Sequence, residues 1–270
     1  MTSYEGTVQT VNATFPAHAI KKSGYSYDGN GNLISRAGNT LVWNHENRLQ
    51  EVKNGSTTIE SYLYDPDGQR VKKTAGSTST YYVNQFYEKS GTTVTQYYYF
   101  NGQRIAMKQG STIYYLHSDH LGGVAMSTAG GTTPGSTSAY NAYGSYRFGG
   151  AIPTDHKFTG QKLDAATGLY YFNSRYYDRD IGTFISPDTI VPDATNLFDY
   201  NRYMMVRGNP LRYSDPTGHD PLDANWEAEF EANHGRSPTD HDRRDRLFSL
   251  MFLGSGSNGA WTQENWSYYT

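Results

Sequence analysis

Short segments of alternating aromatic or β-branched and polar residues, separated by turn residues, make up the first 115 residues. An aromatic residue followed by Asp or Asn, a turn with Gly or Asn, and an apolar residue recurs from Tyr27, Trp43, Tyr64 and Phe100. Asp and Asn side chains accept hydrogen bonds from turn backbone, and Gly adopts positive φ without strain. Each unit therefore predicts a β-hairpin.

The alternation predicts the strands between these turns. A single hairpin buries too little surface to be stable alone, so we expect the hairpins to stack into an extended or spiralling antiparallel sheet. Residues 127–138, which are rich in Ser, Thr and Gly, predict a hairpin tip or loop. The expected strands are Leu41–Trp43, Ser61–Tyr64, Thr80–Tyr87, Thr93–Phe100, Arg104–Lys108 and Ser111–His117.

The pattern of aromatic, apolar and polar residues changes twice further along the chain. Between Gly168 and Gly218, paired aromatic residues alternate closely with Asp and Gly, which predicts tight strands joined by sharp turns. Beyond Gly218, apolar residues at 222, 226 and 230 have helical spacing, and a second helix is expected over 239–252. The fold class is therefore mainly β with a small α-helical C-terminal extension.

Composition agrees with a chain of many short strands. Only 36% of residues are hydrophobic, whereas 25 are Tyr and 28 are Gly, so the core must be built largely from amphipathic rings. The net charge of -3 gives no field that would attract nucleic acid. No cysteine is present, which excludes disulfides, thiolate metal sites and cysteine nucleophiles.

The two ends of the chain bear on its context. No segment approaches the roughly 20 apolar residues that span a bilayer, and the first residues lack the pattern of a signal peptide. The sequence begins in what reads as the middle of a repeat. We therefore expect it to be the C-terminal portion of a longer protein.

Five segments in the second half of the chain are distinctive. They are Tyr-Leu-His-Ser-Asp-His-Leu-Gly-Gly-Val from 115, Phe-Thr-Gly-Gln-Lys-Leu-Asp from 158, Arg-Tyr-Tyr-Asp from 175, Ser-Pro-Asp from 186 and Asp-Pro-Thr-Gly from 215. Together with the N-terminal units they resemble the Rhs/YD-repeat family. The N-terminal units resemble its YD repeats, and residues from about 114 to 218 resemble its Rhs repeat-associated core.

The resemblance implies a division into YD-repeat hairpins over 1–113, the core over 114–218 and a variable extension over 219–270. It also implies a β-ribbon that spirals into a hollow shell around a C-terminal toxin, with an extracellular or cell-surface location. The partners implied are the chain's own extension or a toxin cargo, and further repeats or further copies of the chain. Some relatives use a similar shell for adhesion, which stays an alternative.

Relatives of this kind include some that cut themselves just after the Asp-Pro-x-Gly segment with an aspartic-protease-like centre. In this sequence the candidate catalytic residues are Asp188 and Asp215, with Asp178 as a third carboxylate and Arg175 as a charge partner. Two nearby carboxylates can share a proton, so that one acts as acid while the other activates water. The alternative is that each Asp caps a turn. Self-cleaving relatives typically have Leu after this segment, whereas His219 follows here.

Other candidate sites carry weaker signals. His117, Asp119 and His120 offer metal-ligand types, but such residues more commonly bond to backbone at a strand end. Thr-Asp-His at 154–156 is weaker still. In the tail, acids and imidazoles from Glu227 to Asp242 match no metal signature, and Trp226, Phe230, Phe248, Leu250 and Trp261 predict a helical cap. We expect no cofactor and no metal, and our first interpretation is a non-enzymatic shell segment, with autoproteolytic toxin precursor as the alternative.

Overall fold

The computed structural model describes residues 2–4, 7–11, 16–130, 133–191, 197–219 and 222–223. Most of them belong to one antiparallel sheet of 14 strands that follow one another in sequence order. The strands are β4 (Tyr25–Tyr27), β5 (Leu33–Arg36), β6 (Asn39–Trp43), β7 (Leu49–Asn54), β8 (Thr57–Tyr64), β9 (Arg70–Ala75), β10 (Thr78–Asn84), β11 (Tyr87–Ser90), β12 (Thr93–Phe100), β13 (Gln103–Gln109), β14 (Thr112–Ser118), β15 (Val124–Ala129), β16 (Thr133–Tyr140) and β17 (Tyr146–Gly149).

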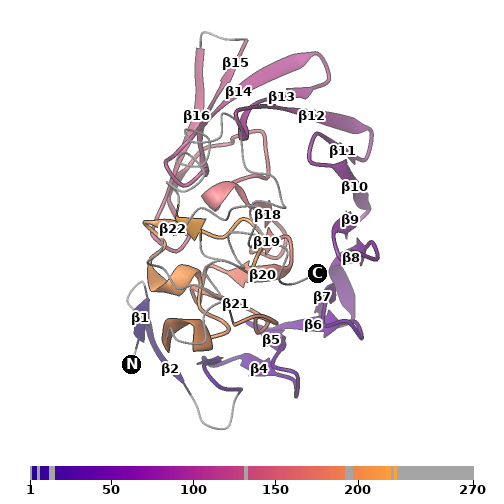
Figure 1. The fold of residues 1–270 in the computed structure, drawn as a ribbon. Coiled ribbons are helices and arrows are strands. Elements are labelled where there is room, and N and C mark those ends of the chain that lie inside the picture. The colour runs from indigo at the N-terminus through magenta and orange to yellow at the C-terminus, as the bar shows by residue number, and fades with distance from the viewer. Residues whose placement is uncertain are drawn as a thin grey trace, which may run out of the picture.

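A second sheet of four strands lies inside the curve of the first (Figure 1). It has the order β18 (Lys162–Asp164), β19 (Leu169–Phe172), β20 (Arg175–Asp178) and β21 (Thr183–Phe184). We call it the central sheet and the 14-stranded sheet the wall. The remaining elements are β1 (Thr2–Tyr4), β2 (Thr7–Val11), β3 (Ile20–Lys21), β22 (Tyr213–Ser214), β23 (Leu222–Asp223) and the 3-10 helices η1 (Phe158–Gly160), η2 (Leu197–Tyr200) and η3 (Val206–Gly208).

Asx turns at one edge of the wall explain why the repeat unit forms hairpins. In the turn that follows β8, the Asp65 amide donates to Gln69 O, and an Asp65 carboxylate oxygen accepts from the Gln69 amide at 2.8 Å. Gly68 has φ +84°, which L side chains rarely adopt. The same closure recurs with Asp28, Asn44 and Asp119 in the first position, and Asn141 repeats its backbone bond. The predicted hairpins and the mainly β fold class are confirmed.

Two predicted boundaries within the wall are wrong. Thr80–Tyr87 is interrupted by a turn at residues 85 and 86, where the Asn84 side chain accepts from the Phe86 amide at 2.9 Å. The aromatic residues on both sides hid this turn, which has no glycine. Residues 127–138 are mostly strand, since β15 continues to Ala129 and β16 begins at Thr133. Their threonines favour a pleated surface.

The predicted helices fall almost wholly outside the described residues. Leu222 and Asp223, which began the first of them, pair instead with Ser214 and Tyr213 as strand β23. The second helix and the cap of tryptophans lie outside the described residues. The boundary predicted after residue 113 falls within β14, and the wall continues across it; the three-part division stays a prediction.

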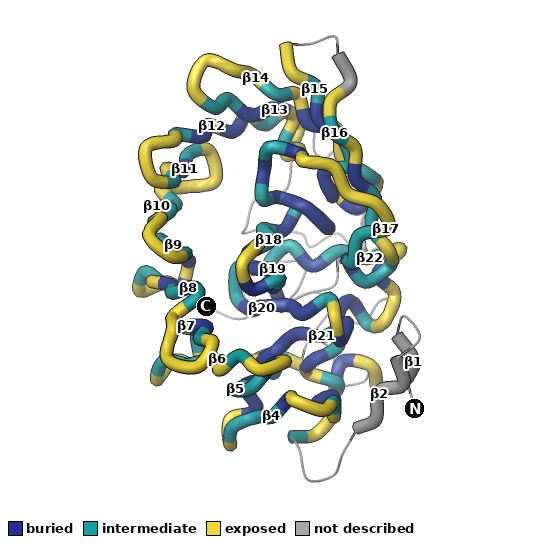
Figure 2. The backbone as a smooth tube through the Cα atoms, turned by 180° about the vertical axis from the view of Figure 1, so that it is seen from behind, coloured by how far each residue is buried: buried dark blue, intermediate teal, exposed yellow. Residues whose placement is uncertain are grey.

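Many of the buried residues lie where the wall faces the central sheet (Figure 2). One apolar cluster joins wall residues such as Leu33, Leu49 and Tyr62 to Tyr171 and Tyr176 of the central sheet. A second lies on the opposite face of the central sheet, around Tyr170, Phe172, Tyr177 and Phe184. Both faces of β19 and β20 are therefore covered, and every residue of these two strands is buried.

Ion pairs cross the same boundary. Arg70 of the wall donates to an Asp164 carboxylate oxygen of the central sheet at 2.5 Å, and neither side chain has exposed surface. Lys73 bonds the other Asp164 oxygen at 2.8 Å, and the Arg70 guanidinium lies 4.2 Å from the centre of the Tyr171 ring. Burial by itself lowers the pKa of Arg70, but Asp164 and the surrounding tyrosines together outweigh it and raise that pKa well above its ordinary value.

We predict that Asp164→Asn lowers the free energy of unfolding by about 3–5 kcal/mol, because Arg70 keeps a buried charge that has lost its partner. Urea unfolding followed by intrinsic fluorescence measures the change. Glu51→Gln is the control, since it breaks an ion pair with Lys53 whose side chains are 29% and 33% exposed, and we expect it to cost about 0–1 kcal/mol. Equal losses in the two variants would contradict a special role for the buried pair.

Candidate functional site

Strand β20 positions the first candidate residue, Arg175, because side chains alternate between the two faces of a strand. Tyr176 and Asp178 face the wall, where Asp178 forms two bonds with the Arg36 guanidinium at 2.6 and 2.9 Å. Arg175 and Tyr177 face the opposite side. Arg175 and Asp178 are three positions apart, so they cannot share a face, and Asp178 does not join the other candidates.

Asp188 and Asp215 are brought together by Arg175. One terminal nitrogen of the guanidinium lies 2.8 Å from an Asp188 carboxylate oxygen and 3.6 Å from an Asp215 carboxylate oxygen. The three side chains are between 3% and 8% exposed. Burial lowers the pKa of the Arg175 guanidinium, and the two carboxylates offset only part of that decrease. Three of the four predicted site residues thus form one buried cluster.

His219 completes this cluster, although sequence reasoning had treated it only as a departure from the family pattern. Its Nδ1 lies 2.7 Å from Asp188 Oδ1, and the same oxygen accepts a hydrogen bond from the Ile190 amide at 3.0 Å. Both oxygens of Asp188 are therefore engaged, one by His219 and the other by Arg175.

The segment from Asp215 to Gly218 is bound through four successive backbone carbonyls. Each accepts a hydrogen bond from a side chain of the core. The donors are Gln161 to Asp215 O at 2.9 Å, Asn173 to Pro216 O at 2.7 Å, Ser174 to Thr217 O at 2.7 Å and Arg175 Nε to Gly218 O. We call these four donors the clamp. Three of them are consecutive in sequence, from the β19–β20 turn into β20.

Gly218 is required by this geometry for two reasons. Its φ is +81°, and a Cβ at this position would lie 2.2 Å from the Phe172 carbonyl oxygen. The Gly218 and His219 amides both donate to Asp215 Oδ1, at 2.7 and 3.1 Å. The peptide bond between residues 218 and 219 is therefore held on both sides, its carbonyl by Arg175 and its amide by Asp215.

A cavity of about 30 Å³ adjoins the cluster. It is lined by Arg175, Asp188, Asp215 and His219 together with Ile190 and several residues between Phe198 and Arg207. A polar cavity of this size holds about one or two water molecules. Water thus has room beside Asp188, Asp215 and His219, and hydrolysis of an amide needs water together with an acid and a base.

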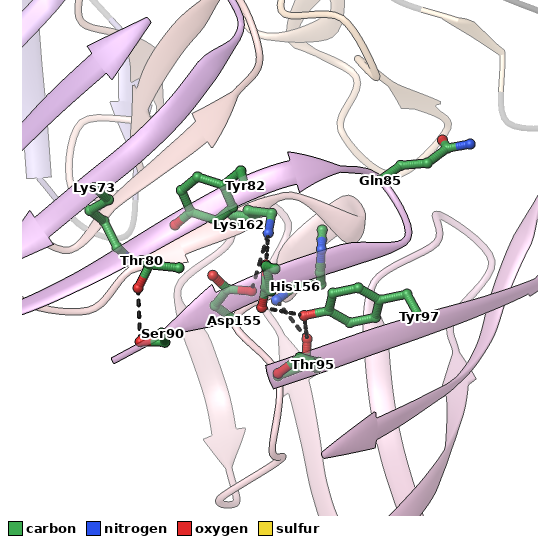
Figure 3. A network of polar contacts seen from close by, with 12 residues as sticks. Lys73, Thr80, Tyr82, Gln85, Ser90, Thr95, Tyr97, Asp155, His156 and Lys162 are labelled. Carbon is green, nitrogen blue, oxygen red and sulfur yellow. Dashed lines mark hydrogen bonds and ion pairs between the residues drawn. The ribbon is translucent and has the colours of Figure 1, made fainter. Parts of the chain in front are cut away.

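A second polar cluster lies where β11, β12 and β18 meet residues 154–156 (Figure 3). The Tyr97 hydroxyl donates to Glu88 at 2.8 Å, and Lys162 bonds the other Glu88 oxygen. Asp155 Oδ1 lies 4.0 Å from Lys162 and has no hydrogen-bond partner among the described residues. His156 bonds Gly160 O through Nδ1 at 2.7 Å, and its ring meets Tyr97 edge to face.

The histidines singled out from the sequence lie apart. His117 lies 3.3 Å from Thr128 Oγ1, whereas His120 contacts Leu211 O at 3.1 Å and Asp119 caps its own turn. In the ranges that the structure describes, no group of three or more potential ligands could hold a metal ion. None of the helices described there has the length and apolar character to cross a bilayer.

Comparison with known proteins gives the class. The family model described as Teneurin YD-shell matches residues 18–211. The chain belongs to this family, whose mainly β fold with a large antiparallel sheet it shares. Crystal structures of TcdB2-TccC3, and of the same pair without the hypervariable C-terminal region, have similar folds. Their TM-scores are 0.58 and 0.54, at 24% and 22% identity over 71% and 72% of this chain and 11% and 13% of those chains.

The names of curated relatives include a nuclease, a toxin and a teneurin. The tRNA nuclease WapA of Bacillus subtilis (strain 168) is 30% identical over 80% of this chain and 10% of its own length. The Double-stranded DNA deaminase toxin A of Burkholderia cenocepacia (strain H111) is 28% identical over 79% of this chain and 14% of its own length. Human Teneurin-4 is 27% identical over 70% of this chain and 8% of its own length. The chain thus spans about a tenth of the length of these relatives.

We predict that the free energy of unfolding decreases as pH falls below 6.5, and that His156 causes part of the decrease. Burial first, and then Arg104 and Lys162, hold the pKa of His156 well below 6.5, while Asp155 opposes them. The unfolded chain therefore gains a proton near pH 6.5 that the native chain does not, and stability is lost from there toward the native pKa.

Urea unfolding at several pH values measures this dependence. His156→Gln, whose amide can still donate to Gly160 O, should flatten the profile just below pH 6.5. His117→Gln should leave the profile unchanged, because His117 is exposed. A His156→Gln profile parallel to that of the wild type would show that the imidazole does not set the dependence.

Proposed function

We propose that this chain is a wall segment of a YD-repeat shell that encloses or presents the element that follows residue 218. The clamp on residues 215–218 is the observation that carries the proposal. A typical hydrogen bond contributes about 0.5–1.5 kcal/mol net, and a bond to a charged group more. Four on consecutive carbonyls hold the chain firmly to the central sheet, so that the segment after the clamp begins inside the curve of the wall.

The ends of the wall support assembly into something larger. Strands β4 and β17 each pair with one neighbour in the described part of the chain, which leaves one side of each available. Free strand edges readily pair with further strands. We propose that further YD repeats or further copies of the chain extend the wall there, that a toxin is the cargo, as the relatives' names suggest, and that the shell is extracellular or on the cell surface. The adhesion alternative stays a prediction.

Arg175→Lys tests the clamp, because an ammonium group cannot reproduce the guanidinium bonds to Gly218 O and to both carboxylates. We expect limited proteolysis of the variant to cut near residues 215–219 about tenfold faster than in the wild type, in line with the loss of about 1.4 kcal/mol. Mass spectrometry of the products locates the cut.

The matched control is Arg48→Lys, since Arg48 also donates to a backbone carbonyl, that of Gly68, in a turn of the wall. The control should leave proteolysis near residue 218 unchanged. If Arg175→Lys resisted the protease at the junction as well as the wild type does, the clamp would not be what retains the chain.

Self-cleavage is the second candidate function, and the contacts of the Gly218–His219 peptide bond favour it. Arg175 polarises the carbonyl, and Asp215 lies against the amide that would leave. In such a reaction water adds to the Gly218 carbonyl carbon while one carboxylate takes its proton. The other carboxyl, protonated beforehand, gives a proton to the departing nitrogen as the C–N bond breaks.

Intact-mass measurement after expression separates the two candidates. The structural role alone predicts a single species at 30.3 kDa. Self-cleavage predicts a fragment that ends near Gly218 or His219, and Asp188→Asn should abolish that fragment because an amide cannot take the proton from water. A fragment that persists in Asp188→Asn would point to an outside protease.

A further inference from the structure

We propose that His219 is a built-in brake on cleavage of the junction. The proposal rests on the self-cleavage candidate and concerns its control. His219 is the first residue beyond the clamp, and its imidazole reaches back to the carboxylate that would activate water. His219 therefore supplies the amide nitrogen of the bond to be cut. At the same time its side chain contacts Asp188, the carboxylate that would activate water.

The engagement of Asp188 supports this role. Asp188 Oδ1 has the His219 Nδ1 at 2.7 Å and the Ile190 amide at 3.0 Å, while Oδ2 has Arg175 at 2.8 Å. A carboxylate that activates water must accept a hydrogen bond from that water. Here the imidazole takes the place of the water at Oδ1, and the cavity of about 30 Å³ lies beside the occupied carboxylate.

An apolar residue at position 219 would leave Asp188 Oδ1 free to accept a hydrogen bond from water. A leucine offers no donor to Asp188 Oδ1, so a water in the cavity can take that place. The His219 side chain is 24% exposed, so a side chain of similar size is accommodated without a buried void. The backbone contacts of residue 219 with Asp215, and those of Gly218 with Arg175, do not involve the imidazole.

His219→Leu in the full chain tests the brake. The purified protein is incubated and followed by intact mass, with the new terminus located by fragment mass. We expect His219→Leu to be cut at the junction faster than the wild type by about two orders of magnitude, the scale of a general-base contribution. The double variant His219→Leu with Asp188→Asn should stay whole, which assigns the cut to the chain itself.

His219→Asn separates loss of the brake from loss of structure, because its amide can still donate to Asp188. It should stay as intact as the wild type, and so should His117→Leu, a change at an exposed histidine away from the junction. A thermal unfolding transition for every variant establishes that it is folded.

The outcomes distinguish the two ideas. If wild type and His219→Leu are cut at the same rate, self-cleavage stands and the brake is wrong. If both remain whole while folded, the brake is wrong and self-cleavage at this junction fails with it. If His219→Asn is cut as fast as His219→Leu, the hydrogen bond to Asp188 is not what restrains the reaction.

Discussion

Buried ion pairs between the wall and the central sheet are the constraint on which the rest of this structure depends. Arg70 and Lys73 bond Asp164, and Arg36 bonds Asp178, all across a boundary otherwise filled by aliphatic side chains and tyrosine rings. Such pairs contribute little net stability, since desolvation costs about as much as the attraction returns, but a misplaced partner is expensive. A strand that slipped by one residue would turn its charge to the other face. The pairs therefore select one register of the wall around the central sheet.

Strand β20 carries this constraint from the wall to the junction. Tyr176 and Asp178 on one face bind the wall, and Arg175 on the other binds Asp188, Asp215 and Gly218. The four residues of β20 form one buried strand. The contacts of Tyr176 and Asp178 with the wall therefore fix the position of the Arg175 guanidinium on the opposite face. The geometry of the exit segment thus depends on the wall being closed correctly around the central sheet, although no wall residue reaches the cluster through the contacts described above.

The sequence predicts the local features well and the distant ones poorly, for a physical reason. The Asx turns at Asp28, Asn44 and Asp65 close within five residues, so residue type and spacing suffice to find them. Arg36 and Asp178 lie 142 positions apart and Arg70 and Asp164 94 apart, and nothing in either neighbourhood indicates the partner. Asp188 and Asp215 were paired by resemblance. Because side chains alternate between the two faces of a strand, the sequence already indicates that Asp178 and Arg175 lie on opposite faces.

The two proposed roles, retention and cutting of the exit segment, involve the same atoms. The Arg175 bond that fixes the Gly218 carbonyl also draws electrons from it, and the Asp215 oxygen that caps the turn also lies against the amide nitrogen. A clamp of this kind is close to a hydrolytic site, because amide hydrolysis needs a polarised carbonyl, a held nitrogen and an activated water. The first two are supplied by retention itself. The two functions therefore differ in the activated water. At Asp188 the position that this water would need is taken by the side chain of His219.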